Sequence, residues 1–231
     1  MSGPDIEVLD DPAAAVAERL VVAAAAGQHI VLTGGSTPRA AYEQAADMGG
    51  DWSRATIWFG DERCVPPEHE HSNFGMANAA LLSRIEPAAV HRMKGELGPH
   101  DGARDYAQQL DEAFGDGFLP EFDLLLLGLG PDAHVASLFP GDPALGEQTK
   151  TVVGVETPGM APLVPRISLT LPVINAASEV VFLVAGEDKA EAVARAFGGL
   201  RPGPDAPASL VRPEQGSLTV LLDPAAAKHI K

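Results

Sequence analysis

The chain has 231 residues, of which 45% are hydrophobic and 21% are charged, and its formal net charge at pH 7 is −16. Because surfaces that bind nucleic acid are normally basic, this acidic balance argues against a nucleic-acid partner, and an anionic substrate would need local donors. With one cysteine, Cys64, no leader pattern and no apolar run of about 18 residues, we expect a cytoplasmic protein without an intramolecular disulfide or a membrane partner.

Hydrophobic patterning predicts strands that alternate with helices along the whole chain. The predicted strands are 6–9, 29–33, 55–59, 90–93, 124–127, 151–155, 179–185 and 217–222. The predicted helices are 11–26, 39–48, 74–85, 102–114, a short helix after 166–170, 187–197 and a terminal helix after 222. Such alternation favours one doubly wound α/β layer structure with a mostly parallel sheet. Since no linker forces a boundary, we expect residues 1–231 to form a single domain.

The stretch from Phe122 to Gly141 delivers polar groups at the end of a buried strand. Its apolar run lacks alternation, which is typical of a strand covered on both faces, and it stops at Gly128 and Gly130. Asp132 and His134 follow, where ligands bind in open α/β sheets. A neutral histidine can take a proton from water, and a carboxylate can fix its tautomer. A purely structural histidine is the alternative.

A strand, glycine turn and helix unit surrounds Gly34, Gly35, Ser36 and Thr37. A helix start presents unpaired N–H groups and a positive dipole end, so phosphate or carboxylate binds there readily. The two hydroxyls add donors. The pattern is neither a Walker A loop nor GxGxxG, so nucleotide binding is not supported. The alternative is a tight turn with a Ser/Thr cap.

Separated charges could complete such a site. Asp61 could orient a substrate hydroxyl or an imidazole, and Arg63 could bind an anion; a surface ion pair is the alternative. Arg166 and Lys189 stand at predicted strand–helix junctions and could close on a phosphate beside Gly34–Gly35. Taken singly, each of the two cations is better explained as a solvated charge.

With these segments placed, nearly the whole chain resembles the 6-phosphogluconolactonase family. The segments that carry the resemblance are, in order, LTGGSTP, WFGDERCVPPEHEHSNFGMAN, LLLLGLGPDAHVASLFPG, PRISLTLPVIN and VAGEDKAEAV. The family's relatives include glucosamine-6-phosphate deaminases and, more distantly, ribose-5-phosphate isomerases. The resemblance implies a three-layer αβα Rossmann-like fold and hydrolysis of 6-phosphoglucono-1,5-lactone, a sugar-phosphate lactone, to 6-phosphogluconate in the oxidative pentose phosphate pathway.

The resemblance also implies roles for particular residues. His134 would be the general base that activates water, with Asp132 and Asp61 orienting this histidine or the sugar hydroxyls. The phosphate would be held by the turn at 34–37 with Arg166 and Lys189, and Arg63 would lie nearby. No metal and no organic cofactor is implied. We expect a monomer or a weak homo-oligomer.

Two details bear on the choice within this group. The deaminases have an Asn-Glu-Pro after the histidine, whose Glu assists ring opening, whereas this chain has Ala136 and Ser137 there. The usual pattern has glycine just before the histidine, whereas here it is Ala133, which would be strained at positive φ. Sugar-phosphate isomerisation or deamination is therefore the second hypothesis. A non-catalytic sugar-phosphate sensor is the third.

Overall fold

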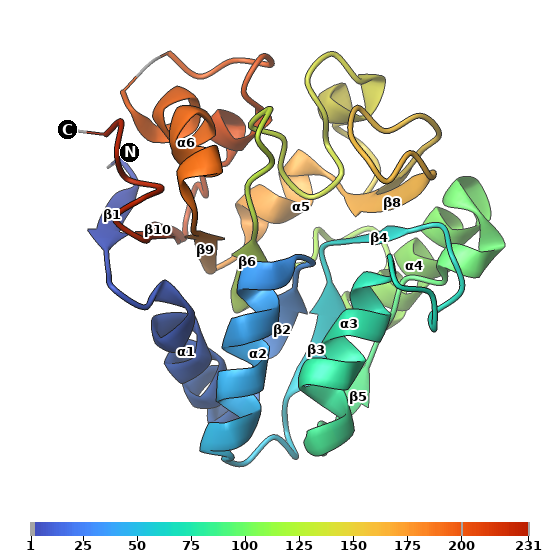
Figure 1. Cartoon of the computed structure of the whole chain (residues 1–231). Helices are drawn as coiled ribbons and strands as arrows, with labels where there is room; N and C mark the ends of the chain where they lie inside the picture. The colour runs from blue at the N-terminus through green and yellow to red at the C-terminus, as the bar shows by residue number, and fades with distance from the viewer. Residues whose placement is uncertain (1–2, 200, 231) are drawn as a thin grey trace.

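The computed structural model describes residues 3–199 and 201–230, in which strands alternate with α-helices except from β3 to β4 and from β6 to β8 (Figure 1). The strands are β1 (Asp5–Val8), β2 (His29–Leu32), β3 (Thr56–Phe59), β4 (Asp61–Arg63), β5 (Ala89–Val90), β6 (Leu124–Leu127), β7 (Val152–Val155), β8 (Arg166–Leu169), β9 (Glu179–Val184) and β10 (Ser217–Leu222). The α-helices are α1 (Pro12–Ala26), α2 (Ser36–Met48), α3 (Asn73–Ala80), α4 (Pro99–Phe114), α5 (Leu171–Ala176) and α6 (Ala190–Phe197).

Seven parallel strands form the main sheet, in the order β1-β10-β9-β6-β2-β3-β5. Their side chains alternate between two cores: Ile30 and Leu32 pack with α1, α2 and α3, whereas Val31 packs with α4, α5 and α6. The three-layer αβα arrangement with a mostly parallel sheet is therefore confirmed.

The middle of the sheet contains a reversal of winding direction. From β2 the chain continues to β3 on one side, and from β6 it continues, after the smaller sheet, to β9 on the other, although β2 and β6 are hydrogen-bonded neighbours. The loops that follow β2 and β6 run in opposite directions, which opens a crevice at the carboxyl ends of these two strands. The turn at 33–35 and the turn at 128–134 meet in this crevice.

A second, three-stranded antiparallel sheet, β4-β8-β7, was not predicted. Its strand β4 follows β3 after a single residue, Gly60, and pairs with β8 more than a hundred residues later in the chain, with Asp61 opposite Ser168. The sheet packs against the same core as α4 and α5. It brings Arg63 and Arg166 to the crevice.

Several predicted boundaries are wrong. Helix α2 begins at Ser36 rather than residue 39, α3 ends at Ala80 with a 3₁₀ turn after it, and β5 has only two residues. The terminal helix is absent from the described residues: the chain after β10 forms turns, in which the N–H groups of Lys228 and Ile230 bind carbonyls three residues earlier rather than four.

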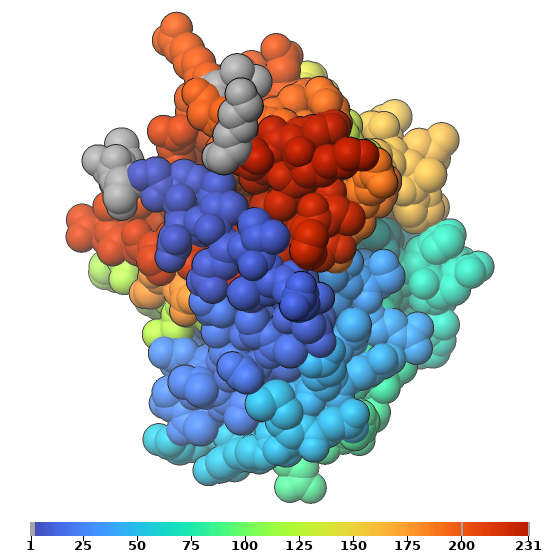
Figure 2. Space-filling view, turned by 60° about the vertical axis from the view of Figure 1, so that its left-hand side comes forward, coloured from blue at the N-terminus to red at the C-terminus, as the bar shows by residue number. Residues whose placement is uncertain are grey.

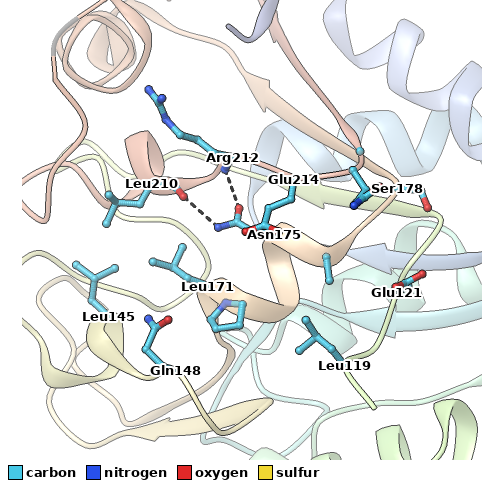
Figure 3. A pocket seen from close by; sticks show the side chains of 14 residues that line it. Leu119, Glu121, Leu145, Gln148, Leu171, Asn175, Ser178, Leu210, Arg212 and Glu214 are labelled. Atoms are coloured by element: carbon cyan, nitrogen blue, oxygen red, sulfur yellow. Dashed lines mark hydrogen bonds between the residues drawn. The ribbon is translucent and has the colours of Figure 1, made fainter. Parts of the chain in front are cut away.

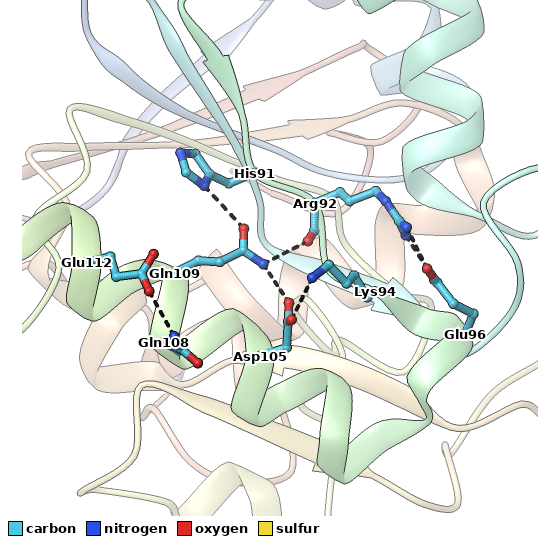
Figure 4. A network of polar contacts seen from close by, with 8 residues as sticks. All are labelled: His91, Arg92, Lys94, Glu96, Asp105, Gln108, Gln109 and Glu112. Carbon is cyan, nitrogen blue, oxygen red and sulfur yellow. Dashed lines mark hydrogen bonds and ion pairs between the residues drawn. The ribbon is translucent and has the colours of Figure 1, made fainter.

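Polar contacts hold the segment after β5 against α4 (Figure 4). The Gln109 side chain donates from Nε2 to Asp105 Oδ2 at 2.7 Å, and its Oε1 lies 3.2 Å from His91 Nδ1. Lys94 Nζ donates to the other oxygen of Asp105 at 2.6 Å. The predicted strand 90–93 is shorter than expected: the His91 N–H still donates to Ile57 of β3 at 2.8 Å, but the next carbonyl, of Arg92, accepts from Gln109 Nε2 of α4 at 3.4 Å.

The described ends of the chain lie side by side, because β1 at the edge of the main sheet pairs with β10. Figure 2 shows this face, with the N-terminal segment in blue beside the C-terminal segment in red. None of the helices in the part of the chain that the structure describes is long and apolar enough to cross a membrane.

Candidate active site

A cavity of about 200 Å³ opens in the crevice at the carboxyl ends of the parallel strands. It gathers all of the predicted site residues except Asp132, although they come from distant parts of the chain. The predicted residues that line it are Gly34, Gly35, Ser36, Thr37, Asp61, Arg63, His134, Arg166 and Lys189.

Asp132 lies directly behind His134. The distance from His134 Nδ1 to Asp132 Oδ1 is 2.6 Å, and the same oxygen accepts the backbone N–H of His134 at 3.1 Å. Burial alone would raise the pKa of Asp132, but its hydrogen bonds with His134 and the charge of that residue together hold the pKa below its ordinary value. An ionised carboxylate only accepts, so the proton of a neutral imidazole lies on Nδ1 and Nε2 is left as a base.

The backbone around this pair is unusual. Ala133 and Ala136 both have positive φ, +65° and +49°. Gly130 is needed for contact rather than for conformation, because a Cβ there would lie 2.0 Å from His134 Nδ1. Its N–H donates to the His134 carbonyl at 3.1 Å and is therefore not free to bind an oxyanion. Phe139 packs on the other side of the imidazole, at 4.5 Å between ring centroids.

The start of α2 forms the opposite wall. Its capping residue, Gly35, has φ +119° and supplies no side chain, and Pro38 carries no N–H, so the first N–H groups of the helix, at Ser36 and Thr37, face the cavity without a side-chain cap. The Tyr42 hydroxyl fixes the residue before the turn, since it accepts the Thr33 N–H at 2.9 Å and donates to the Thr33 carbonyl at 2.8 Å.

Arg63 and Arg166 are direct partners in the β4–β8 ladder, where like charges would repel each other without an anion. Arg166 is 3% exposed and donates to the carbonyls of Met160, Pro162 and Val164. Burial lowers the pKa of Arg166, the nearby Asp61 carboxylate opposes this shift, and Arg63 adds to it. These two guanidinium groups therefore form the cationic side of the cavity.

The Arg63 guanidinium is only partly engaged. It donates from Nη1 to the His71 carbonyl at 2.7 Å, while its buried Nε has no partner among residues 3–199 and 201–230. Lys189 stands at the far side, with its Nζ 3.8 Å from the nearest oxygen of Asp188. Within the described part of the chain this loose ion pair is the one that Lys189 makes, so its ammonium group can serve a ligand.

Asp61 is 5% exposed, and its carboxylate accepts hydrogen bonds from Ser137 and Asn73 rather than from His134. Sequence reasoning missed these two partners and also missed Glu62, whose carboxylate accepts from the N–H groups of Asn73 and Phe74 at 2.7 and 2.8 Å. A polar Ser-Asn pair at a helix start was the available signal.

A larger cavity, of about 790 Å³, lies at the amino ends of β6, β9 and β10 (Figure 3). The amide of Asn175 at its centre is bonded to the Leu210 carbonyl and the Arg212 N–H. Its lining carries one arginine, Arg212, and the two carboxylates of Glu121 and Glu214, so the cavity does not suit an anionic ligand.

Within residues 3–199 and 201–230 no group of three or more His, Cys, Asp or Glu side chains is placed to hold a metal ion.

Comparison with known proteins places this geometry in a family. The sequence profile described as glucosamine-6-phosphate isomerases/6-phosphogluconolactonase matches residues 6–220. The chain belongs to this family. The family's 6-phosphogluconolactonase of Streptomyces coelicolor is 41% identical over 243 aligned positions, which cover 98% of this chain and 92% of that protein. The 6-phosphogluconolactonase of Mycobacterium tuberculosis is 40% identical over 241 positions, covering 97% and 96%.

Solved structures of the family agree. The 6-phosphogluconolactonase of Trypanosoma brucei superposes with a TM-score of 0.88 at 28% identity and covers 100% of both chains. The one of Thermotoga maritima gives 0.80 at 30% identity and covers 95% of this chain and 99% of its own. A monomeric glucosamine-6-phosphate deaminase gives 0.80 at 20% identity, which shows the shared fold alone. The predicted resemblance to the lactonase family and its Rossmann-like fold is confirmed.

Proposed function

We propose that the protein hydrolyses 6-phospho-D-glucono-1,5-lactone to 6-phospho-D-gluconate, the second step of the oxidative pentose phosphate pathway, with residues 1–231 acting as one functional unit in the cytoplasm. The observation that carries the proposal is that one cavity joins a carboxylate-oriented histidine to an uncapped helix start and three cations. Relatives that are about 40% identical over nearly the whole chain and are named 6-phosphogluconolactonase support it.

His134 is the general base of the proposed reaction. With its proton on Nδ1 and that proton held by Asp132 at 2.6 Å, Nε2 accepts a proton from water while the water oxygen attacks the lactone carbonyl carbon. The tetrahedral intermediate collapses when the bond from this carbon to the ring oxygen breaks, and the imidazolium returns its proton to that oxygen. The products are a carboxylic acid, which ionises, and a free hydroxyl group.

The phosphate binds far from the reacting carbon and fixes the ring. The N–H groups and hydroxyls of Ser36 and Thr37, with Arg63, Arg166 and Lys189, supply a helix dipole and fixed positive charge against the net charge of −16. Binding energy from this remote group orients the carbonyl toward His134. Asp61 faces the same cavity and accepts a hydrogen bond from a sugar hydroxyl.

The test is lactone hydrolysis at slightly acidic pH, where the uncatalysed opening is slow. His134→Ala should lower kcat about 10²-fold or more, because a positioned general base contributes about that much. Hydrolysis by His134→Ala at the wild-type rate would refute the assigned role. The second hypothesis is checked by measuring ammonia release from glucosamine 6-phosphate, and the sensor hypothesis by binding of 6-phosphogluconate without any hydrolysis.

A further inference from the structure

Asn73, which is not among the predicted site residues, stands where three parts of the site meet. It is 2% exposed, begins α3 and lines the cavity. Its Nδ2 donates twice to Asp61, to the backbone carbonyl at 2.9 Å and to carboxylate Oδ1 at 3.1 Å. Its own N–H is held by the carboxylate of Glu62 at 2.7 Å. The side chain is therefore anchored from its backbone outward to Asp61.

The other end of the Asn73 amide is left without a donor. Its Oδ1 is buried and has no hydrogen-bond partner among residues 3–199 and 201–230. It packs against Gly34, where an added Cβ would lie 1.9 Å from this oxygen. If the amide were flipped, Oδ1 would face two acceptor oxygens of Asp61. The hydrogen bonds to Asp61 therefore fix the orientation of the Asn73 amide. An orphaned buried acceptor is costly, which indicates that the donation to Asp61 outweighs that cost.

The second oxygen of Asp61 is held from the opposite side. Ser137 is fully buried and donates from Oγ to Asp61 Oδ2 at 2.6 Å. Its own N–H donates to Ser168 Oγ at 3.1 Å, which ties it to β8. The two carboxylate oxygens of Asp61 are thus hydrogen-bonded from two sides, by α3 and by the turn that follows His134.

We infer that Asn73 is a positioning residue, which with Ser137 fixes the Asp61 carboxylate so that its remaining lone pairs meet one substrate hydroxyl. The inference rests on the proposed function for the identity of the substrate. It also explains why a glycine is needed at position 34: a side chain there would occupy the space of the Asn73 amide, in addition to narrowing the phosphate site.

A double-mutant cycle tests whether Asn73 acts through Asp61. Asn73→Ala should lower kcat/KM for the phosphorylated lactone about tenfold or more, as expected for losing a hydrogen bond to a charged group. In an Asp61→Asn background, the same change should alter kcat/KM less than about twofold, because the carboxylate it positions is gone. Effects that multiply in the double variant would overturn the inference, and so would unchanged activity in Asn73→Ala.

Asn73→Asp gives a signature that a merely structural role would not produce. It keeps the shape of the side chain but sets a second carboxylate within about 3 Å of Asp61, and such pairs share one proton. When the introduced carboxyl group holds that proton, it can donate a hydrogen bond to Asp61, as the Asn73 amide does. The ratio of variant to wild-type kcat/KM should therefore rise as pH falls from about 8 to about 5.5. A ratio that is constant across this range would contradict the inference.

The matched control is Asn78→Ala, on the same helix but exposed, which should change kcat/KM less than about twofold. Melting temperatures of all variants separate misfolding from mispositioning. If the wild-type protein binds 6-phosphogluconate but hydrolyses no lactone, the proposed function fails. The same cycle is then measured on the Kd for 6-phosphogluconate, where additive losses would overturn the positioning role and non-additive losses would support it.

Discussion

A Cβ atom on Gly130 would lie 2.0 Å from Nδ1 of His134 and 2.7 Å from Oδ1 of Asp132. The imidazole therefore folds back over its own turn, into space that only glycine leaves open. The hydrogen bond between Asp132 and His134 therefore depends on the absence of a side chain at Gly130.

Gly130→Ala should consequently lower kcat about 10²-fold, because the ring must leave the position in which Asp132 orients it. The KM for the phosphorylated lactone should change little, since the phosphate contacts lie on other segments. Steady-state kinetics give both values. Gly146→Ala is the control: a Cβ there meets nothing within 4 Å. Gly130→Ala with normal kcat would show that the orientation seen here is not the reactive one.

Asp132→Asn tests the assignment of the tautomer. An amide that donates to Nδ1 would leave the imidazole proton on Nε2, where it blocks proton transfer from water, so we expect kcat to fall about 10²-fold or more. Stability should respond as well: since the pKa of Asp132 is lowered by folding, its contribution is present above the ordinary value of 3.8 and is lost as pH falls below it. Acid unfolding monitored by circular dichroism should therefore be less steep in the variant. An unchanged kcat would contradict the assigned tautomer.

The dyad and its strand could be predicted from the sequence because their signals are local. The run at 124–127, the glycine that ends it and the Asp-x-His pair lie within a dozen residues. The surroundings of Asp61 could not be predicted in the same way. Ser137 is 76 positions away, and β4 is too short to show any periodicity.

The C-terminal segment shows a different reason for failure. Alanines at 225–227 have high helix propensity, and this favoured a terminal helix. The segment forms turns instead, and Asp223 at its start accepts the Gly186 N–H, at the end of the neighbouring strand β9, at 3.1 Å. Propensity read from one segment contains no information about such a partner.

Tyr42→Phe should weaken both the fold and phosphate binding. Removing the hydroxyl leaves the buried N–H and carbonyl of Thr33 unpaired, which should cost about 1–3 kcal/mol of unfolding free energy. Because Thr33 precedes the glycine turn, KM should rise for the 6-phosphorylated lactone more than for the unphosphorylated lactone. Urea unfolding and kinetics on both substrates check this. Equal changes in the two KM values would separate Tyr42 from phosphate binding.

Acid should loosen the aromatic cluster around His29. Burial, opposed by Asp123 and reinforced by His91, lowers the pKa of His29, and its Nδ1 accepts the Trp58 indole N–H at 3.1 Å. The neutral form is therefore favoured in the folded protein. The contribution of His29 to stability is fully present above the unfolded value of 6.5 and is lost as pH falls below it.

His29→Phe should remove that part of the pH dependence, although it also removes the acceptor for Trp58. The measurement is the urea midpoint at pH values above and below 6.5, followed by tryptophan fluorescence. His100→Gln is the control, because the side chain of His100 is 68% exposed. If the wild-type and His29→Phe midpoints shift equally between the two pH values, another group is responsible.

Ala133 tests how a departure from the usual glycine is tolerated. Its φ of +65° is strained for an L-residue by roughly 1–2 kcal/mol, while its fully buried methyl contributes about 0.8 kcal/mol. These terms nearly cancel, so Ala133→Gly should change the unfolding free energy by less than about 1 kcal/mol and leave kcat unchanged. Ala177→Gly, at a buried site with φ −64°, has no strain to relieve and should destabilise by about 1 kcal/mol.

Ala133→Val adds both bulk and a β-branch at positive φ, and should destabilise by at least about 2 kcal/mol. Urea unfolding of the three variants gives the comparison. Equal losses in Ala133→Gly and Ala177→Gly would mean that the left-handed backbone at Ala133 stores no strain. In that case the turn before His134 would be held by its contacts alone, including the Ala133 carbonyl, which accepts the Ala208 N–H at 3.0 Å.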